Sequence, residues 1–211
     1  MATGKISLAL DEELIGGAGK SDAEVIEDAL AVYLGLRALD AARAQGILDP
    51  EQADRLAVEE VRATISGGGG NDRINGGSGS DRVNGGSGKD RISGSSGNDS
   101  ISGSSGNDRI NGNSGRDRIS GGSGNDRLNG STGSDVVSGS SGKDVISGSS
   151  GNDRLSGNSG NDRINGNSGN DRISGGSGND RLKGGSGNDR IDGGPGKDRI
   201  SGGSGKDRTK Q

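Results

Sequence analysis

A nine-residue period constrains the fold of this chain more than any other feature of its sequence. From Gly67 to Lys210 the consensus G-[GSN]-S-G-[NKSR]-D-R-[ILV]-[NS] runs through sixteen consecutive copies with no insertion or deletion. An aspartate recurs at the sixth position, and an aliphatic residue follows two positions later, except at Thr209 in the last copy. A short, fixed period of this kind predicts a solenoid in which each repeat stacks on its neighbours.

The amino-acid composition excludes several kinds of metal site and catalytic site. Of 211 residues, 47 are glycine and only 24% are hydrophobic, and there is no Phe, Trp, Cys or His. The absence of Cys excludes disulfides and thiolate metal sites, and the absence of His removes the commonest general base and zinc ligand. Serine is abundant, but no His can activate it as a nucleophile. We therefore expect a binding protein and not an enzyme.

The distribution of charge divides the chain near Ser66. Residues 1–66 hold six Lys and Arg against thirteen Asp and Glu, a balance of −7, whereas residues 67–211 hold twenty against seventeen, a balance of +3. We expect a small acidic domain over 1–66 and a repeat domain over 67–210. The sequence contains no run of eighteen apolar residues, so it does not predict a membrane-spanning helix. No apolar stretch follows the first five residues to predict a secretory signal peptide.

The acidic domain is expected to contain one strand and two helices. Polar and apolar residues alternate over 5–10, which is typical of a half-buried strand. Ser21 and Glu24 form a capping box that opens one helix, and Asp49 followed by Pro50 opens the second. The simplest interpretation is a helical unit that caps the end of the solenoid or joins two copies into a homodimer.

This strand and capped helix, over 5–62, resemble ribbon-helix-helix repressors and antitoxins. The resemblance implies a dimer whose paired strands enter the major groove of DNA, with Lys5, Ser7 and Ala9 facing the bases. Two features oppose it: the linker over 11–20 is short for the family's first helix, and a domain of charge −7 lacks the basic clusters that bind phosphate. A nucleic-acid partner is therefore the weaker alternative.

The consensus repeat resembles the RTX calcium-binding nonapeptide, G-G-x-G-x-D-x-U-x. The resemblance implies a mainly β fold, a parallel β-roll in which six residues form a turn, three form a strand and two repeats complete a coil. Sixteen repeats then give a roll of about eight coils. The residue types agree, since glycine permits tight turns and an aliphatic residue between two polar ones points inward from a short strand.

Stacked coils would place aspartates of equal charge in columns, which must be neutralised by a cation. Calcium fits best, because it takes six to eight oxygen ligands and mixes carboxylates with backbone carbonyls. Magnesium demands stricter octahedral geometry, and zinc lacks its preferred ligands here. Each aspartate would share an ion with the aspartate eighteen residues later, for up to about fourteen ions. The expected ligands are Asp72, Asp81, Asp90, Asp99, Asp108, Asp117, Asp126, Asp135, Asp144, Asp153, Asp162, Asp171, Asp180, Asp189, Asp198 and Asp207.

Arginine occupies the seventh position in thirteen of the sixteen repeats, and Ser100, Val136 and Val145 are the exceptions. These arginines could pair with the aspartates and give a metal-free roll of ion-pair ladders, and they could also weaken the affinity for calcium. A third interpretation is that they form a solvated outer face. We favour calcium with arginine facing the solvent.

The leading functional hypothesis is a roll that folds when calcium binds, because the free energy of metal binding then becomes free energy of folding. Without calcium, the Gly/Ser-rich repeats are expected to be disordered. The resemblance to RTX repeats implies export from a low-calcium cytoplasm and favours an extracellular location. The antitoxin-like segment over 5–62 favours the cytoplasm. One alternative is a DNA-binding regulator with a repeat tail. Another is an ice- or surface-binding solenoid, in which Ser at the third position and Asn at the fifth form regular rows.

Overall fold

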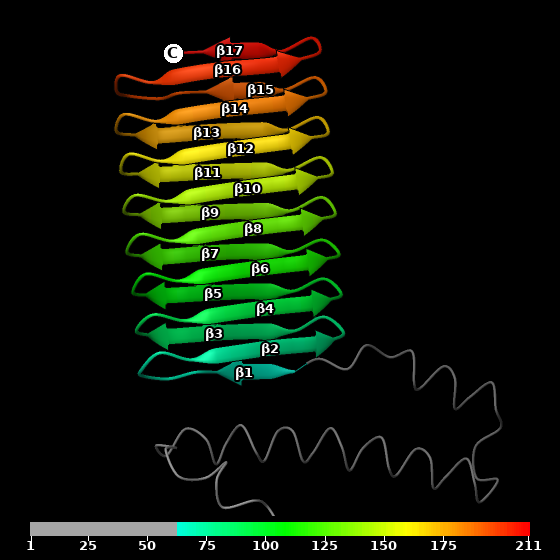
Figure 1. Cartoon of the computed structure of the whole chain (residues 1–211), viewed down its shortest axis with the longest axis vertical. Coiled ribbons are helices and arrows are strands. Elements are labelled where there is room, and N and C mark those ends of the chain that lie inside the picture. The colour runs from blue at the N-terminus through cyan, green and yellow to red at the C-terminus, as the bar shows by residue number, and fades with distance from the viewer. Residues whose placement is uncertain (1–62) are drawn as a thin grey trace, which may run out of the picture.

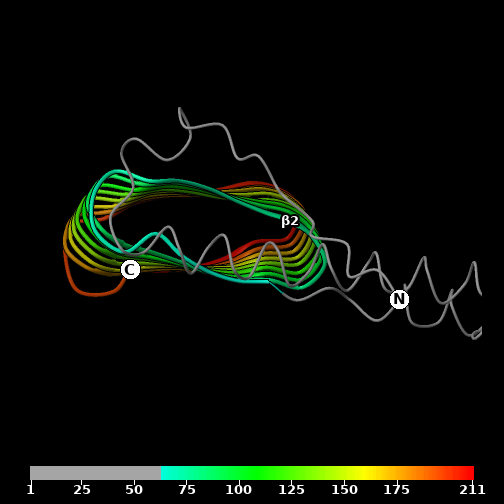
Figure 2. The same cartoon turned by 90° about the horizontal axis from the view of Figure 1, so that it is seen from below.

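Two parallel β-sheets that face each other make up residues 63–211, the part of the chain that this computed structural model describes (Figure 1). The odd-numbered strands form a nine-stranded sheet in the order β1-β3-β5-β7-β9-β11-β13-β15-β17, and the even-numbered strands β2 to β16 form an eight-stranded sheet. Seen along its axis, the roll is a flattened ring in which each coil is slightly offset from the one before it (Figure 2). The predicted parallel β-roll of about eight coils is confirmed.

The strands recur every nine residues. They are β1 (Thr64–Ser66), β2 (Arg73–Ser78), β3 (Arg82–Ser87), β4 (Arg91–Ser96), β5 (Ser100–Ser105), β6 (Arg109–Ser114), β7 (Arg118–Ser123), β8 (Arg127–Thr132), β9 (Val136–Ser141), β10 (Val145–Ser150), β11 (Arg154–Ser159), β12 (Arg163–Ser168), β13 (Arg172–Ser177), β14 (Arg181–Ser186), β15 (Arg190–Asp192), β16 (Arg199–Ser204) and β17 (Arg208–Lys210). The expected strand over 5–10, the two helices, the ribbon-helix-helix resemblance and the proposed dimerisation unit all lie outside the described residues.

The register places each residue beside its equivalent eighteen positions away. On β10 and β12, for example, Val145 lies opposite Arg163 and Ile146 opposite Ile164. Two nonapeptides therefore complete one coil, and identical repeat positions form straight columns along each sheet. The first strand, β1, pairs with Arg82–Asn84 of β3, so the roll begins before the first nonapeptide.

A single column of aliphatic side chains on each sheet fills the interior. Their positions in the strands are flanked by exposed and half-exposed residues, as the period of two along a strand requires. The buried members are at most 3% exposed: Val83, Ile92, Ile101, Ile110, Ile119, Leu128, Val137, Ile146, Leu155, Ile164, Ile173, Leu182 and Ile191. The expected inward direction of the eighth repeat position is confirmed.

The expected division into a six-residue turn and a three-residue strand is wrong. Most strands span six residues, from the seventh position of one repeat to the third of the next. The glycine at the first position stays outside the pairing, as Gly76 does between the paired residues Asn75 and Gly77. The residue at the second position then turns the chain through a left-handed conformation, with φ of 95° at Gly77 and 79° at Ser95. Pairing resumes at this corner residue and continues to the third position, which lengthens the strand.

No helix in residues 63–211 is long and apolar enough to cross a membrane.

Candidate metal centre

The sixteen aspartates predicted as ligands lie in two columns, one leading into the strands of each sheet. Each aspartate is the last residue before its strand, and its side chain points into the roll. Asp72, Asp198 and Asp207, near the two ends, are half-buried. The other thirteen are only 1–2% exposed: Asp81, Asp90, Asp99, Asp108, Asp117, Asp126, Asp135, Asp144, Asp153, Asp162, Asp171, Asp180 and Asp189.

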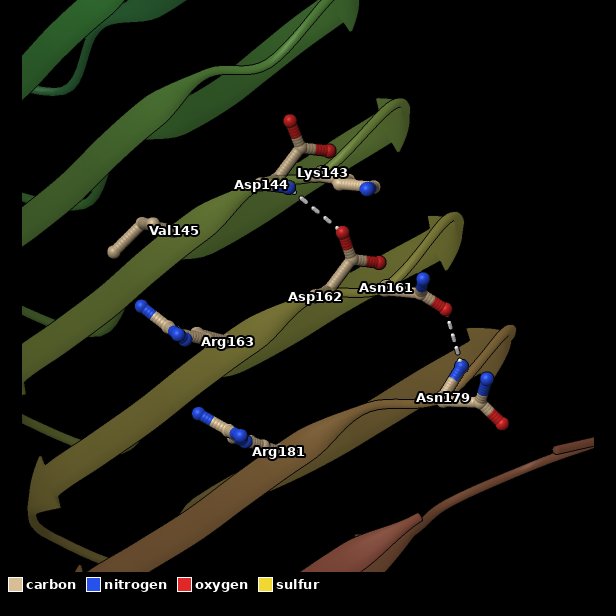
Figure 3. A pocket seen from close by; sticks show the side chains of 8 residues that line it. All are labelled: Lys143, Asp144, Val145, Asn161, Asp162, Arg163, Asn179 and Arg181. Carbon is tan, nitrogen blue, oxygen red and sulfur yellow. Dashed lines mark hydrogen bonds between the residues drawn. The ribbon is translucent and has the colours of Figure 1, made fainter. Parts of the chain in front are cut away.

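One oxygen of each carboxylate from Asp81 to Asp207 links two coils. The backbone N–H of Asp144 donates to Oδ1 of Asp162 at 2.8 Å, as Figure 3 shows. The same bond recurs along both columns, from Asp72 N–H to Asp90 Oδ1 at 2.8 Å through Asp189 N–H to Asp207 Oδ1 at 3.0 Å. The expected stacking of aspartates eighteen residues apart is thus present, and it uses Oδ1 as a structural acceptor.

The second carboxylate oxygen, Oδ2, is buried and accepts no hydrogen bond in any of the thirteen buried aspartates from Asp81 to Asp189. Buried polar atoms are ordinarily paired, and leaving an ionised one unpaired is costly. Burial accordingly raises the pKa of Asp117, Asp144, Asp153 and Asp162 to about 6, although the N–H bond from the preceding coil opposes the shift. Repulsion between neighbouring aspartates contributes to the same rise in pKa. A positive charge beside Oδ2 would therefore stabilise the ionised form of these buried carboxylates.

A glycine at the first repeat position leaves open the space that Oδ2 faces. A Cβ built on Gly76 would lie 2.8 Å from Asp81 Oδ2 and 2.7 Å from the carbonyl oxygen of Gly94 in the next coil. Gly121, with Asp126 and Gly139, repeats this arrangement. A carboxylate oxygen and a backbone carbonyl oxygen thus border the same space, and this mixture of hard oxygen donors is the one that calcium takes.

Within residues 63–211, no three acidic side chains gather into one cluster. Since calcium takes six to eight oxygens, an ion here needs backbone carbonyls to complete its shell. The carboxylate and carbonyl oxygens present fit calcium when backbone carbonyls complete its shell. They do not fit zinc, which prefers nitrogen and sulfur ligands.

The arginines at the seventh position lie on the opposite face of the strand from the aspartates. They are exposed, and Figure 3 shows Arg163 and Arg181 projecting away from the carboxylates of Asp144 and Asp162. Within the described residues the single ion pair joins Lys210 Nζ to Asp192 Oδ2 at 3.2 Å. The described residues therefore do not form the alternative Arg–Asp ion-pair ladders. The arginines form the expected solvated outer face.

A ladder of asparagines at the fifth position was missed by the sequence analysis as a structural element. The Oδ1 atom of Asn161 accepts a hydrogen bond of 2.7 Å from the N–H of Asn179 (Figure 3). The same bond joins Asn107 to Asn125 and Asn170 to Asn188. The recurrence of Asn at this position was the available signal, because a short amide side chain reaches backbone groups that a longer cation does not.

Comparison with known proteins agrees with this geometry. The family model described as RTX calcium-binding nonapeptide repeat (4 copies) matches residues 64–92, 84–119, 93–128, 120–155, 138–173, 147–182 and 174–208. No curated protein matches the chain, and nothing in the comparisons supports the ribbon-helix-helix resemblance of 5–62. Repeats of this kind bind Ca²⁺ in their stacked, aspartate-containing turns, and several ions fit the two columns. The chain belongs to the RTX calcium-binding nonapeptide repeat family.

Proposed function

We propose that this chain binds a series of Ca²⁺ ions between its stacked coils and that this binding drives the folding of the β-roll. The sixteen aspartates from Asp72 to Asp207 supply the carboxylates, and the glycine-containing turns supply carbonyl oxygens. The observation that carries the proposal is the row of buried Oδ2 atoms without hydrogen bonds from Asp81 to Asp189. A bound cation would satisfy these atoms and remove the repulsion between neighbouring carboxylates.

The coupling of binding to folding follows from the small apolar core. Thirteen of the sixteen nonapeptides each bury one aliphatic side chain, whereas ordering the remaining residues opposes folding through lost conformational entropy. Without an ion, the charged columns add an electrostatic penalty to that entropy loss. Under these conditions the free energy of metal binding becomes free energy of folding.

Titration with calcium tests the proposal directly. The full chain in a chelator is expected to give a far-UV circular dichroism spectrum of a largely unfolded chain, and millimolar calcium is expected to convert it to a β spectrum. Magnesium at the same concentration should produce a smaller change, since it demands stricter octahedral geometry. Equilibrium dialysis in the same buffer should show several ions bound per chain. An identical spectrum in chelator and in calcium would refute coupled folding, and dialysis without bound calcium would refute binding itself.

We further infer that the protein acts by binding and not by catalysis, and that it works outside the cell. The repeats offer sixteen equivalent carboxylates and no His or Cys, so no single position is set apart as a catalytic acid or nucleophile. A roll that depends on calcium would fold where calcium is abundant, which favours the extracellular space over the cytoplasm. Fractionation of the producing cells with an antibody against the roll tests the location.

A further inference from the structure

The outer surface of the roll is almost purely basic. Residues 67–211 contain twenty Lys and Arg and seventeen Asp and Glu. Sixteen of these acids are the aspartates of the two inward columns, and the remaining one, Asp192, pairs with Lys210. The acids that balance the charge of the sequence therefore lie inside the roll. The cations on its outside have no acidic partners in residues 67–211 except at that one pair.

The parallel register arranges the outer cations in straight rows. Arg73, Arg91, Arg109 and Arg127 lie side by side on β2, β4, β6 and β8, with neighbouring strands about 4.8 Å apart. The row ends at Val145 on β10, which is 42% exposed. Like charges directly opposite each other on adjacent strands destabilise a sheet. A row of four guanidinium groups without counter-charges is thus a surface that an external anion would stabilise.

Polar side chains stand beside this row and extend its hydrogen-bonding capacity. A shallow cavity of about 290 Å³ is lined by Arg73, Arg91 and Arg109 together with Asn75 and Ser93 of the same sheet. Guanidinium groups bind carboxylate and sulfate-like oxygens with paired, charge-assisted hydrogen bonds. Amide and hydroxyl groups next to them would bind neutral hydroxyls of the same ligand.

We propose that the row Arg73–Arg91–Arg109–Arg127 binds an extended acidic polysaccharide whose sugars carry carboxylates. Such a polymer presents acidic groups at regular intervals along an extended backbone and hydroxyls between them, which matches the row and its polar neighbours. Nucleic acid matches less well. Single strands are held largely by stacking on aromatic side chains, and residues 63–211 contain none. The major groove of a duplex admits a helix or a two-stranded ribbon, and the face of a broad sheet does not enter it.

Fluorescence polarisation with a short, fluorescein-labelled oligogalacturonate tests the proposal in saturating, buffered calcium. The full chain is expected to bind the acidic oligomer, with an affinity that falls as salt rises, and to ignore a neutral galactose oligomer of the same length. The odd-numbered sheet carries an equivalent row, Arg154, Arg172, Arg190 and Arg208, so the variants are made in a parent chain in which those four residues are serine. Replacing Arg73, Arg91, Arg109 and Arg127 in this parent by serine, the residue found naturally at this position in Ser100, should weaken binding at least about tenfold, the equivalent of one charge-assisted hydrogen bond.

A matched variant distinguishes the contribution of the arginine row to binding from that of the overall charge. Lys89→Ser, Arg116→Ser, Lys197→Ser and Lys206→Ser together remove the same charge from the fifth position, where Ser80 and Ser134 occur naturally. This variant should retain most of the binding. Circular dichroism of every sample reports whether the roll is folded, so failure of calcium-dependent folding is distinguished from failure of the row. Absence of binding by the folded wild type, equal losses in the two variants, or tighter binding of single-stranded or duplex DNA would each overturn the proposal.

Discussion

The backbone N–H of Asp126 donates a hydrogen bond of 2.8 Å to Oδ1 of Asp144, eighteen residues later in the chain. The two oxygens of one carboxylate therefore have different tasks. Oδ1 holds the preceding coil in register, whereas Oδ2 faces the interior without a hydrogen bond. Substitutions that treat the two oxygens differently can separate the structural task from the proposed binding of calcium.

Asp144→Asn is expected to keep the link between coils and to weaken calcium binding. The Asn side chain retains a carbonyl oxygen that can accept the N–H of Asp126, but it carries no negative charge. In chelator the variant should be no less stable than the wild type, because an unpaired buried charge has been removed. In calcium it should need a higher calcium concentration to fold.

Calcium titrations followed by circular dichroism measure this midpoint, and Asp192→Asn is the matched control. Asp192 is the acid of the repeat region that faces outward, so its loss changes the net charge equally without touching either column. An equal shift of the calcium midpoint in both variants would contradict the assignment of Asp144 as a ligand.

Acid is expected to stabilise the metal-free roll. Burial raises the folded-state pKa of Asp117, Asp144, Asp153 and Asp162 to about 6, whereas an unfolded Asp titrates near 3.9. A group with a raised pKa contributes stability that is fully present below its unfolded pKa and is lost as pH rises through its folded pKa. Metal-free stability should therefore be greatest near about pH 4 and decline up to about pH 6 to 7.

Circular dichroism in chelator, recorded across this pH range, measures the effect. Calcium should reverse its sign, because protons compete with the ion for the same carboxylates. In saturating calcium the roll is expected to lose stability as the pH falls below about 6. A metal-free chain that gains structure with rising pH would show that these aspartates are not buried as described.

Gly121→Ala should destabilise the roll more than a substitution at the adjacent glycine. A Cβ on Gly121 would meet Oδ2 of Asp126 and lie 2.8 Å from the carbonyl oxygen of Gly139. Such overpacking typically costs about 1–3 kcal/mol. The Cβ would also intrude on the space proposed for calcium, so the calcium midpoint should rise as well.

Gly122→Ser is the control for this change. At its present φ of 103°, a Cβ on Gly122 would meet the carbonyl oxygen of Ser104. Ser104 and Ser140, at the same repeat position in the sheet, carry a side chain at left-handed φ angles of 74° and 79°, so we expect Gly122→Ser to be accommodated by a rotation toward those angles. Thermal unfolding in saturating calcium should show a smaller loss for Gly122→Ser than for Gly121→Ala. Equal losses would mean that the space over Gly121 has no special role.

Ile146→Ala tests the aliphatic column. Ile146 is 1% exposed, and truncating a buried Ile costs about 2–5 kcal/mol. Val145→Ser changes the adjacent, 42% exposed residue and should stay within about 0.5 kcal/mol of the wild type. Because a solenoid couples each coil only to its neighbours, the Ile146 change should also make thermal unfolding less cooperative. Similar melting curves for the two variants would contradict the assignment of the core.

Much of the fold follows from the period alone. Ile92 was expected to point inward because it lies between two polar residues in a short strand, and it is buried. Its neighbour Arg91 was favoured as an outward residue, and it is exposed. The burial of Asp90 was not predicted. The stacking of residues eighteen positions apart required the resemblance to a known repeat, since a period of nine does not state how many repeats make a coil.

Other features could not be predicted from the repeat. The bond from Asp126 N–H to Asp144 Oδ1 depends on a side-chain rotamer and on the offset between coils, which leave no trace in a sequence pattern. The left-handed corner at Ser95 is hidden because serine seldom adopts that conformation, although Gly and Asn at equivalent positions hint at it. The six-residue strands follow from this corner, and they were therefore missed as well.

The unbroken register of the two sheets also bears on how such a gene can vary. Deleting any eighteen residues between Gly67 and Lys210 would remove one whole coil and bring equivalent residues together across the junction. Deleting nine residues would also preserve the core, but every strand after the deletion would move to the opposite sheet. A deletion before Arg154 would therefore place the row that includes Arg154 and Arg172 on the sheet of β2. Tandem copies in DNA expand and contract by such whole units through slippage. The length of this protein and the pattern on its faces can thus change between generations while its cross-section is inherited unaltered.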